Sequence, residues 1–535
     1  MKFSLASAAA AALGLATAVT ANAIPQKRAA ATDPIVIKGS KLFHKNSGQQ
    51  FFIKGVAYQA DLSGVDAAAL PSGQLFVDPL TDATACARDV PLMQALDTNL
   101  IRVYAIDTTK SHDACMKLLV NAGIYVVADL SEPGLSIDRD SPAWDYALYK
   151  RYTSVIDLMQ QYDNVMGFFA GNEVTNNNTN TDASPFVKAA VRDMKAYIKS
   201  KGYRQIPIGY ATNDDEKTRE PMAEYFDCGD SDSAVDFWGY NIYSWCGASS
   251  LQTSGWQDRA EYYSKFNIPV FFAEYGCNTI RPRKFTEVAA LYGNVMSPVI
   301  SGGIVYMYFE EANNYGLVSI DSAGHATKLP DYSYLSAEIA TATPSSVAMS
   351  AYKPTATAAQ ACPTNDVNWS ASTALPPTPD NDTCNCVQSQ FSCVPASNLD
   401  DSKYGAIFAY ICGQLGADGC GPITGNGTSG SYGSYSMCPP VVRLGWALNA
   451  YYASQNNAAS ACDFSGQAKL ATPGTVSSSC SSKLDASGGT TGKTSTGTTS
   501  GGSSSSTDKP SSAVNMAVPA SFTFFAALVL SILMA

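Results

Sequence analysis

Two glutamates stand at the ends of apolar, aromatic-rich runs that lie far apart in the sequence. Glu173 follows Asn172 after the run of residues 164–172, and Glu274 ends a similar run, residues 268–274. Short apolar runs predict fully buried strands, and the carboxyl ends of strands line the active site of a parallel α/β barrel. One glutamate alone could simply cap a strand or pair with arginine. Two of the same design favour glycoside chemistry, which needs a proton donor and a nucleophile or base.

The two glutamates can be assigned different roles. In a retaining mechanism one carboxylate attacks the anomeric carbon, while the other, protonated, delivers a proton to the leaving oxygen. The acid needs a raised pKa and the nucleophile must stay ionised. An asparagine before the acid suits a hydrogen bond to the sugar 2-hydroxyl. We expect Glu173 to be the acid/base, Glu274 the nucleophile and Asn172 a sugar-binding residue, with Tyr275 pointing away by strand alternation.

Other residue types that commonly carry catalysis are scarce in this chain. There are three histidines, His44, His112 and His325, and none lies in an HExxH pattern or near a cysteine pair. A zinc site or a histidine-based triad is therefore not expected, and the chemistry calls for no metal or organic cofactor. The formal charge of −11 argues against a nucleic-acid partner.

Strand and helix signals alternate along the first two thirds of the chain. Residues 34–38 and 50–55 alternate like a strand pair that leads into a first barrel strand. Helix-length segments separate the further strand candidates, which are residues 100–107, 123–129, 164–172, 206–212, 235–243, 268–274 and 302–310. Counting the first, eight strands in this order predict an α/β fold, the (β/α)8 or TIM barrel. Glu173 would end the fourth strand and Glu274 the seventh.

Both ends of the chain resemble processing signals. An Ala/Leu-rich run with a small-residue cleavage pattern predicts a secretory signal peptide over residues 1–23, and Lys27-Arg28 offers a second, dibasic cleavage site. The apolar tail is shorter than a membrane-spanning helix and nothing charged follows it. This pattern predicts a glycosylphosphatidylinositol (GPI) signal over residues 513–535. The attachment candidates are Ser511, Ser512 and Asn515.

The composition changes after the predicted barrel, residues 29–340. Residues 341–382 are rich in Ala, Thr, Pro and Ser, which predicts an extended linker. Residues 383–480 hold eight cysteines, which predicts a small disulfide-rich α+β module; its aromatics are either core residues or platforms for sugars. From Ser477 the chain is Ser/Gly/Thr-rich, and residues 481–512 are expected to form a disordered stalk.

The cysteines and glycosylation signals indicate a location outside the cell. The chain has fourteen cysteines, an even number that fits an oxidising compartment. Sequons for N-glycosylation fit the same route, and they lie at Asn177, Asn368, Asn381 and Asn426.

Four motifs stand in order along the chain. They are Arg102-Val-Tyr-Ala-Ile106, Gly171-Asn-Glu-Val174, Trp238-Gly-Tyr-Asn-Ile-Tyr243 and Phe272-Ala-Glu-Tyr-Gly276. Together with both termini they closely resemble glycoside hydrolase family 72, the fungal GPI-anchored β-1,3-glucanosyltransferases of the cell wall. The likeness covers roughly residues 30 to 340 and continues through the cysteine-rich module, which is similar to carbohydrate-binding module family 43.

The resemblance implies a retaining transglycosylation that elongates cell-wall glucan. An internal β-1,3 bond is cleaved, the new reducing end is held as a glycosyl-enzyme ester, and it passes to the non-reducing end of another glucan. The implied partners are β-1,3-glucan donor and acceptor chains and, through the GPI anchor, the outer face of the plasma membrane. The implied glucan contacts are the loop of residues 131–139 and Tyr104, Asn172, Asp214, Arg219, Tyr243 and Tyr306, to which Asp129 is added because it ends a strand.

The resemblance also implies the disulfide pairing, which spacing alone leaves open because six cysteines allow fifteen pairings. In the catalytic part the implied pairs are Cys86–Cys115, Cys228–Cys362 and Cys246–Cys277. In the module they are Cys384–Cys438, Cys386–Cys480, Cys393–Cys462 and Cys412–Cys420.

Two alternatives stay open at this point. An endo-β-1,3-glucanase would use the same barrel but let water resolve the intermediate. A non-catalytic wall protein would use the barrel and the module only to bind glucan, although it would have no need of both glutamates.

Overall fold

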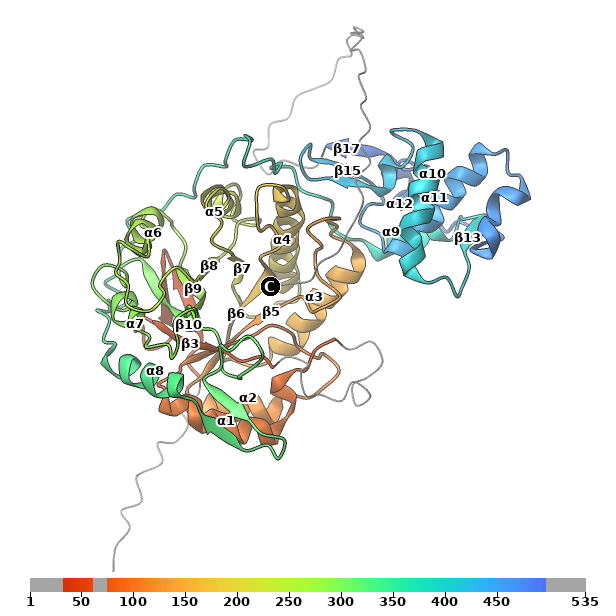
Figure 1. The fold of residues 1–535 in the computed structure, drawn as a ribbon. Coiled ribbons are helices and arrows are strands. Elements are labelled where there is room, and N and C mark those ends of the chain that lie inside the picture. Colours follow the sequence, from red (N-terminus) through yellow and green to blue (C-terminus); the bar gives the residue numbers. More distant parts are fainter. Residues whose placement is uncertain (1–31, 61–74, 497–535) are drawn as a thin grey trace, which may run out of the picture. The chain divides into compact units, whose positions relative to one another are not determined.

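The structure, a computed structural model, describes residues 32–60 and 75–496. Eight parallel strands close into a barrel in the order β10-β3-β4-β5-β6-β7-β8-β9, with helices around it (Figure 1). The strands are β3 (Ile53–Ala57), β4 (Leu100–Val103), β5 (Tyr125–Asp129), β6 (Val165–Asn172), β7 (Ile208–Thr212), β8 (Phe237–Ile242), β9 (Val270–Tyr275) and β10 (Ile300–Val305). The predicted barrel is confirmed, and Glu173 follows its fourth strand while Glu274 lies in its seventh.

Helices follow the strands in the order that the alternating pattern predicts. Two of them begin at aspartates whose side chains accept backbone N–H groups, Asp82 before α1 and Asp145 before α3. The helices and short 3-10 turns of this part are η2 (Pro79–Thr81), α1 (Ala83–Ala95), α2 (Asp113–Ala122), α3 (Tyr146–Met159), η3 (Thr181–Ala183), α4 (Ser184–Ser200), α5 (Arg219–Asp227), α6 (Trp256–Tyr263), α7 (Glu287–Leu291) and α8 (Pro330–Thr341).

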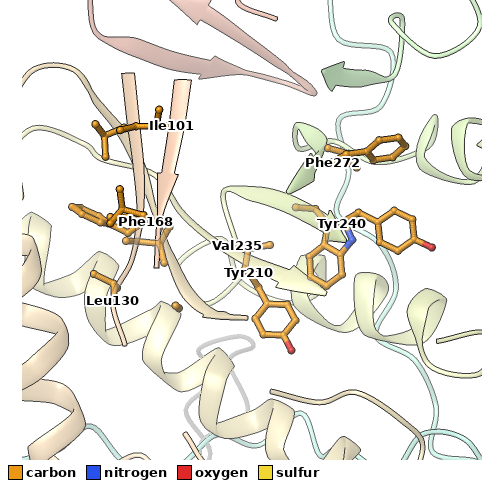
Figure 2. Close-up of a cluster of buried hydrophobic side chains, with 14 of the residues drawn as sticks. Ile101, Leu130, Phe168, Tyr210, Val235, Tyr240 and Phe272 are labelled. Carbon is orange, nitrogen blue, oxygen red and sulfur yellow. The ribbon is translucent and has the colours of Figure 1, made fainter. Parts of the chain in front are cut away.

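Strand residues alternate between two apolar layers. Figure 2 shows the layer that contacts the helices, where Phe168, Tyr240 and Phe272 lie. Phe169, Phe237 and Phe271 belong to the second layer, inside the barrel, where their ring centroids are 5.3 to 6.1 Å apart. Bulky side chains inside a barrel form a packed core. This interior supports the residues at the carboxyl ends of the strands.

The N-terminal strand pair differs from the prediction. β1 (Ile35–Lys38) pairs antiparallel with β2 (Lys41–His44), and residues 53–57 form the first barrel strand instead of a partner for β1. The prediction was wrong because it missed the tight turn between β1 and β2. Gly39 adopts φ 55° there, a conformation that glycine supplies at little cost and that two-residue hairpins require.

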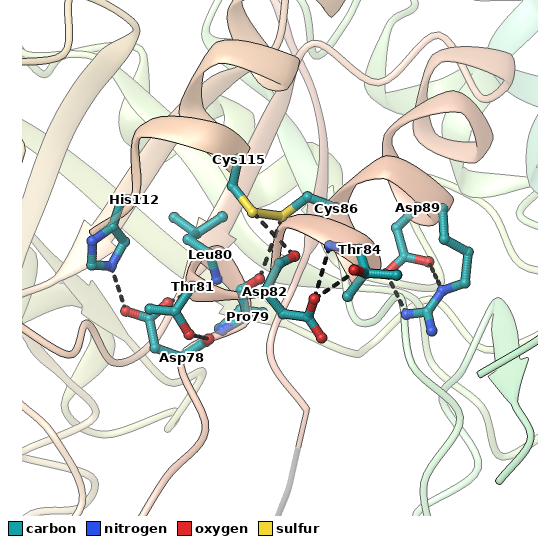
Figure 3. Close-up of a disulfide and its surroundings, with 12 residues drawn as sticks. Asp78, Pro79, Leu80, Thr81, Asp82, Thr84, Cys86, Asp89, His112 and Cys115 are labelled. Carbon is teal, nitrogen blue, oxygen red and sulfur yellow. Dashed lines mark hydrogen bonds and ion pairs between the residues drawn. A yellow bond between two sulfur atoms is a disulfide. The ribbon is translucent and has the colours of Figure 1, made fainter. Parts of the chain in front are cut away.

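A disulfide ties the first two helices of the barrel together (Figure 3). Cys86 in α1 is bonded to Cys115 in α2. Beside it, Asp78 accepts the backbone N–H of Leu80 at 2.8 Å and pairs with the ring Nε2 of His112 at 2.7 Å. His112 is therefore a satisfied structural residue. A short hairpin of β11 (Val318–Ile320) and β12 (Ala326–Lys328) precedes α8.

The linker runs without helices or strands from the end of α8 to the start of α9. It is nevertheless anchored, because Cys362 is bonded to Cys228 and Trp369 is buried against Tyr225 with ring centroids 5.3 Å apart. The remaining disulfides are Cys246–Cys277, Cys384–Cys438, Cys386–Cys480, Cys393–Cys462 and Cys412–Cys420. All seven pairs are those that the family resemblance implies.

The C-terminal module has its own apolar core. Its helices are α9 (Asn381–Gln388), α10 (Tyr404–Leu415), α11 (Pro440–Ser454) and α12 (Ser478–Ser487), joined by the 3-10 turns η4 (Asp401–Lys403), η5 (Gly421–Ile423), η6 (Ala459–Cys462) and η7 (Phe464–Gly466). Its strands are β13 (Cys393–Pro395), β14 (Gly425–Asn426), β15 (Ser431–Gly433), β16 (Ala468–Leu470) and β17 (Thr494–Thr496). The mixed content agrees with the predicted α+β module.

The predicted disordered stalk begins too early in the sequence. Residues 478–487 form α12, which Ser477 caps and which buries Leu484, and β17 pairs with β15. The indole of Trp446 donates to the Thr490 carbonyl at 2.9 Å. Composition misled the prediction because one disulfide, one leucine and strand pairing suffice to order a Ser/Gly/Thr-rich segment. The predicted signal peptide, the GPI signal and the three attachment candidates lie outside the described residues.

Candidate active site

An irregularity at the end of β6 presents both Asn172 and Glu173 to one site. Phe168 and Ala170 pack outside the barrel and Phe169 packs inside, so strict alternation would turn Asn172 outward. The register with β7 shifts between Phe169 and Asn172, and the Asn172 side chain bonds to residues of the barrel interior. Glu173 itself has φ 48°. A left-handed backbone at a residue other than glycine is strained, and such strain concentrates at functional sites.

A second irregularity directs Glu274 into the barrel. Phe271 and Ala273 of β9 pack inside, which would leave Glu274 outside if alternation continued. The register with β8 shifts between Phe272 and Glu274, and Tyr275 then packs in the outer layer. Bulges commonly re-aim a side chain beside active sites. Tyr275 is therefore structural, as the sequence predicts.

Three donors surround the Glu274 carboxylate. The hydroxyl of Tyr104 donates to Oε1 and that of Tyr243 donates to Oε2, both at 2.8 Å. Nη1 of Arg102 lies 3.3 Å from Oε1. Glu274 is only 8% exposed, so its charged form depends on these donors.

Arg102 is the centre of the site, although no role was predicted for it from the sequence. Its guanidinium is fully buried, pairs with both oxygens of Asp129, and donates to Oδ1 of Asn172 at 3.0 Å. Asp129, predicted to contact glucan, is thus occupied in orienting Arg102. Alternation could have revealed Arg102, because it stands two residues before Tyr104 and must share its face of the strand.

Asn241 links the two catalytic candidates and was also missed. Its Nδ2 donates to Oε1 of Glu173 at 2.7 Å and to Oδ1 of Asn172 at 3.1 Å. Asn241 also stands opposite Glu274 in the β8–β9 register. A continuous hydrogen-bonded chain therefore runs from Glu274 through Arg102, Asn172 and Asn241 to Glu173.

Burial and charge act in opposite directions on the nucleophile candidate. Burial raises the pKa of Glu274 above its ordinary 4.5, the Arg102 guanidinium lowers it, and the charge of Glu173 raises it again. The hydroxyls of Tyr243 and Tyr104 lower it, and the net result is a raised pKa. The mechanism inferred from the sequence requires a raised pKa at the acid, Glu173. In the structure the more deeply buried carboxyl of the pair is Glu274.

The other predicted glucan contacts lie around this centre. Nη1 of Arg219 lies 2.8 Å from Oδ1 of Asp214, which also accepts the Tyr240 hydroxyl. In the loop of residues 131–139, Nη2 of Arg139 donates to the Glu173 carbonyl at 2.7 Å. This loop therefore helps to hold the strained backbone of Glu173.

Tyrosines form a wall beside the nucleophile. The ring of Tyr306 lies edge-on to those of Tyr104 and Tyr243, with centroids 6.5 Å apart in both cases. Tyr315, for which no role was predicted, packs 5.3 Å from Tyr306 and 5.7 Å from Tyr243, measured between ring centroids. A cavity of about 310 Å³ opens next to this wall, lined by Tyr104, Tyr306, Met307, Phe76 and Pro133 among others. Aromatic walls of this kind suit the flat faces of sugars.

The predicted glycosylation sites lie at the surface to different degrees. Asn426 is exposed, whereas Asn177, Asn368 and Asn381 are partly exposed. Oδ1 of Asn177 accepts the backbone N–H and the hydroxyl of Thr179. Among the residues that the structure describes, no helix is long and apolar enough to cross a membrane.

Comparison with known families and proteins points to one enzyme class. Residues 24–343 match the family Glyco_hydro_72, described as glucanosyltransferase, and residues 391–469 match the X8 domain. A 1,3-beta-glucanosyltransferase of Arthroderma benhamiae is 53% identical over 493 residues, which cover 89% of each chain. The 1,3-beta-glucanosyltransferase gas1 of Schizosaccharomyces pombe is 46% identical over 91% of this chain and 86% of its own. The structure of Saccharomyces cerevisiae Gas2p in complex with laminaripentaose superposes with a TM-score of 0.76 at 45% identity, covering 82% of this chain and 97% of the other.

Proposed function

The chain belongs to the glucanosyltransferase family, glycoside hydrolase family 72, and we propose that it is a retaining 1,3-β-glucanosyltransferase that elongates β-1,3-glucan of the cell wall. The observation that carries the proposal is the hydrogen-bonded chain that joins Glu274 to Glu173 inside the barrel. It places a desolvated carboxylate, stabilised by three donors, within electrostatic reach of a second carboxyl group.

In the first step, Glu274 attacks the anomeric carbon of the donor glucan. The bond between that carbon and the glycosidic oxygen breaks, and Glu173 gives its proton to the leaving oxygen. Arg102, Tyr104 and Tyr243 hold the attacking carboxylate. Oδ1 of Asn172 accepts from Arg102, which leaves its NH₂ group to donate to the sugar 2-hydroxyl in this mechanism.

In the second step, Glu173 acts as a base on an acceptor hydroxyl. The hydroxyl oxygen bonds to the anomeric carbon, the ester bond to Glu274 breaks, and Glu173 takes up the hydroxyl proton. The cavity beside Tyr104 and Tyr306 supports an acceptor subsite. An acceptor sugar that packs there would displace the water that otherwise hydrolyses the ester.

The remaining glucan contacts are part of the same proposal. Asp214 and Arg219 would bind sugar hydroxyls on one side of the catalytic pair, and the loop of residues 131–139 would border the same groove. Asp129 contributes by orienting Arg102. This arrangement requires no metal or organic cofactor.

We infer the remaining organisation of the chain from its ends and its domains. After removal of residues 1–23, residues 29–340 would catalyse, and the cysteine-rich module would follow the anchored linker. A GPI anchor added near Ser511, Ser512 or Asn515 would hold the enzyme at the outer face of the plasma membrane, facing the wall. A chain that ends before residue 511 should be secreted into the medium; continued membrane association would contradict the anchor.

The proposal is tested by product analysis with a reduced laminarin oligosaccharide as acceptor and a laminarin oligosaccharide as donor. The secreted enzyme should make products longer than the donor. Glu173→Gln should lower turnover by at least about a hundredfold and still bind glucan. Shorter products alone would identify a hydrolase, and unchanged turnover in Glu173→Gln would remove Glu173 from the mechanism.

A further inference from the structure

A buried arginine outside the catalytic pair holds the backbone of the tyrosine wall. Arg283 lies in the loop that connects β9 to α7 and is 2% exposed. Its Nη1 donates to the Tyr306 carbonyl at 2.6 Å and to the Gly276 carbonyl at 3.2 Å. Its Nη2 donates to the Tyr315 carbonyl at 2.5 Å. One guanidinium therefore joins three backbone segments, the end of β9 and the two positions that carry the outer tyrosines of the wall.

The orientation of Arg283 is itself fixed. Its Nε donates to Oδ2 of Asp331 at 2.6 Å, and its backbone N–H donates to Oδ1 of the same residue at 3.2 Å. Asp331 is 3% exposed and lies at the start of α8. The guanidinium also packs over Phe285, 4.8 Å from the ring centroid. Because a planar fork with fixed donors can satisfy several acceptors at once, lysine cannot replace it.

Two neighbouring contacts reinforce the same connection. Nδ2 of Asn278 donates to the carbonyls of Asn313 at 2.8 Å and Asn314 at 3.2 Å, and Cys277 is bonded to Cys246. The β9–α7 loop therefore ties the segment of residues 306–317 to the strand that carries Glu274. The wall and the nucleophile are built on one connected support.

We propose that Arg283 is a positioning residue that sets the ratio of transfer to hydrolysis by holding Tyr306 and Tyr315 in place. The proposal rests on the proposed transferase function. In the first step the leaving sugar is still covalently joined to the bound donor glucan, so the contacts of the rest of that chain also hold it in place. The second step is a competition between an acceptor sugar, which must pack against the tyrosine wall, and water, which needs no wall. Displacing the wall therefore weakens transfer while cleavage continues.

The test compares Arg283→Lys with Arg204→Lys. Arg204 also donates to two backbone carbonyls, those of Tyr162 and Val165. Tyr162 precedes β6 and Val165 is its first residue, so both carbonyls lie at the end of the barrel opposite the site. With laminarin oligosaccharide as donor and a reduced oligosaccharide as acceptor, Arg283→Lys should raise the acceptor KM about tenfold and lower the transfer-to-hydrolysis ratio about tenfold. Donor cleavage should stay within about twofold of wild type, and Arg204→Lys should leave the ratio unchanged.

The other outcomes of this experiment would overturn the proposal, and a second variant serves if Arg283→Lys does not fold. An unchanged ratio and acceptor KM in folded Arg283→Lys would make Arg283 purely structural. A parallel loss of cleavage and transfer would show that it supports the whole site instead of the acceptor wall. If Arg283→Lys does not fold, Asp331→Asn, which removes the charge that orients Arg283, must show the same change in ratio or the proposal fails. A wild-type enzyme that gives no transfer product would refute the proposed function itself.

Discussion

The nucleophile candidate depends on its neighbours for its charge. Glu274 is buried, and burial opposes ionisation, whereas Arg102 and two tyrosine hydroxyls favour it. Activity requires the ionised form, so the pH at which Glu274 loses its proton should set the acidic limb of the kcat/KM profile. Because its pKa is raised, that limb should lie above the ordinary glutamate range.

Removal of one donor should move this limb further. Tyr243→Phe deletes the hydroxyl that donates to Oε2 of Glu274, and a lost donor to the charged form raises the pKa again. We expect the acidic limb of kcat/KM to shift to higher pH and the plateau to fall about tenfold, the effect of one hydrogen bond to a charged group. Tyr306→Phe is the matched control, because it removes the hydroxyl of a neighbouring wall tyrosine and leaves the hydroxyl bonds of Tyr104 and Tyr243 to Glu274 intact. An acidic limb that stays in place in Tyr243→Phe would contradict this electrostatic account.

The strands of the barrel place the catalytic residues through their irregularities. Both glutamates follow register shifts, between Phe169 and Asn172 in β6 and between Phe272 and Glu274 in β9. Beneath them, Phe169 lies 4.5 Å from the Arg102 guanidinium carbon, measured from the ring centroid. The packing of the interior therefore reaches the catalytic centre directly.

A single methyl group inside the barrel should test this coupling. A Cβ at Gly239 would lie 2.7 Å from Cε1 of Phe169 and 2.9 Å from Cβ of Ala273. Gly239→Ala should destabilise the barrel by about 1–3 kcal/mol through overpacking, measured by denaturant unfolding, and should lower activity by displacing Phe169. In contrast, Gly405→Ala adds a methyl with nothing within 4 Å in helix α10 and should leave stability unchanged or slightly higher. Equal stability of Gly239→Ala and wild type would show that the interior relaxes without cost.

Sequence periodicity predicted the strands of the barrel better than it predicted the register shifts and turns that interrupt them. The eight strands and the order of the glutamates follow from apolar runs and alternation, whereas the outward Tyr275 also depends on the register shift in β9. Arg102 and Asn241 were missed although each shares a strand face with a tyrosine that was named. The register shifts have no sequence signal of their own, because a bulge depends on how neighbouring strands pair. The β1–β2 turn was missed although Gly39-Ser40, between two short apolar runs, is a two-residue hairpin signal.

In the molecule as a whole, disulfides and buried side chains order segments whose composition predicts disorder. The Ser/Gly/Thr-rich segment from Ser477 was predicted to be disordered, yet Cys480 is bonded to Cys386 and Leu484 is buried. In the linker, Cys362 and Trp369 likewise fix a segment that lacks regular elements. A few anchors thus order chain whose composition alone predicts flexibility.

Truncation should locate the true end of the module. A chain that ends at residue 496 should keep the thermal stability of the full secreted enzyme. A chain that ends at residue 487 keeps Cys480 and α12 but loses β17 and the Thr490 carbonyl that accepts from Trp446, and its module should melt several degrees lower. A chain that ends at residue 476 also leaves Cys386 without its partner and should be secreted poorly. Equal stability of the chains that end at residues 496 and 487 would contradict a structural role for β17 and the Thr490 carbonyl.

In the proposed mechanism Glu274 forms the glycosyl-enzyme ester, and Glu173 serves it as acid and base. The most direct measurement uses a 2-deoxy-2-fluoro β-1,3-glucan oligosaccharide fluoride, which forms the intermediate but resolves it slowly, followed by peptide mapping by mass spectrometry. We expect one sugar adduct per chain, on the peptide that contains Glu274, and none in Glu274→Gln. An adduct on Glu173 or Asp129, or turnover of the probe without any adduct, would contradict it.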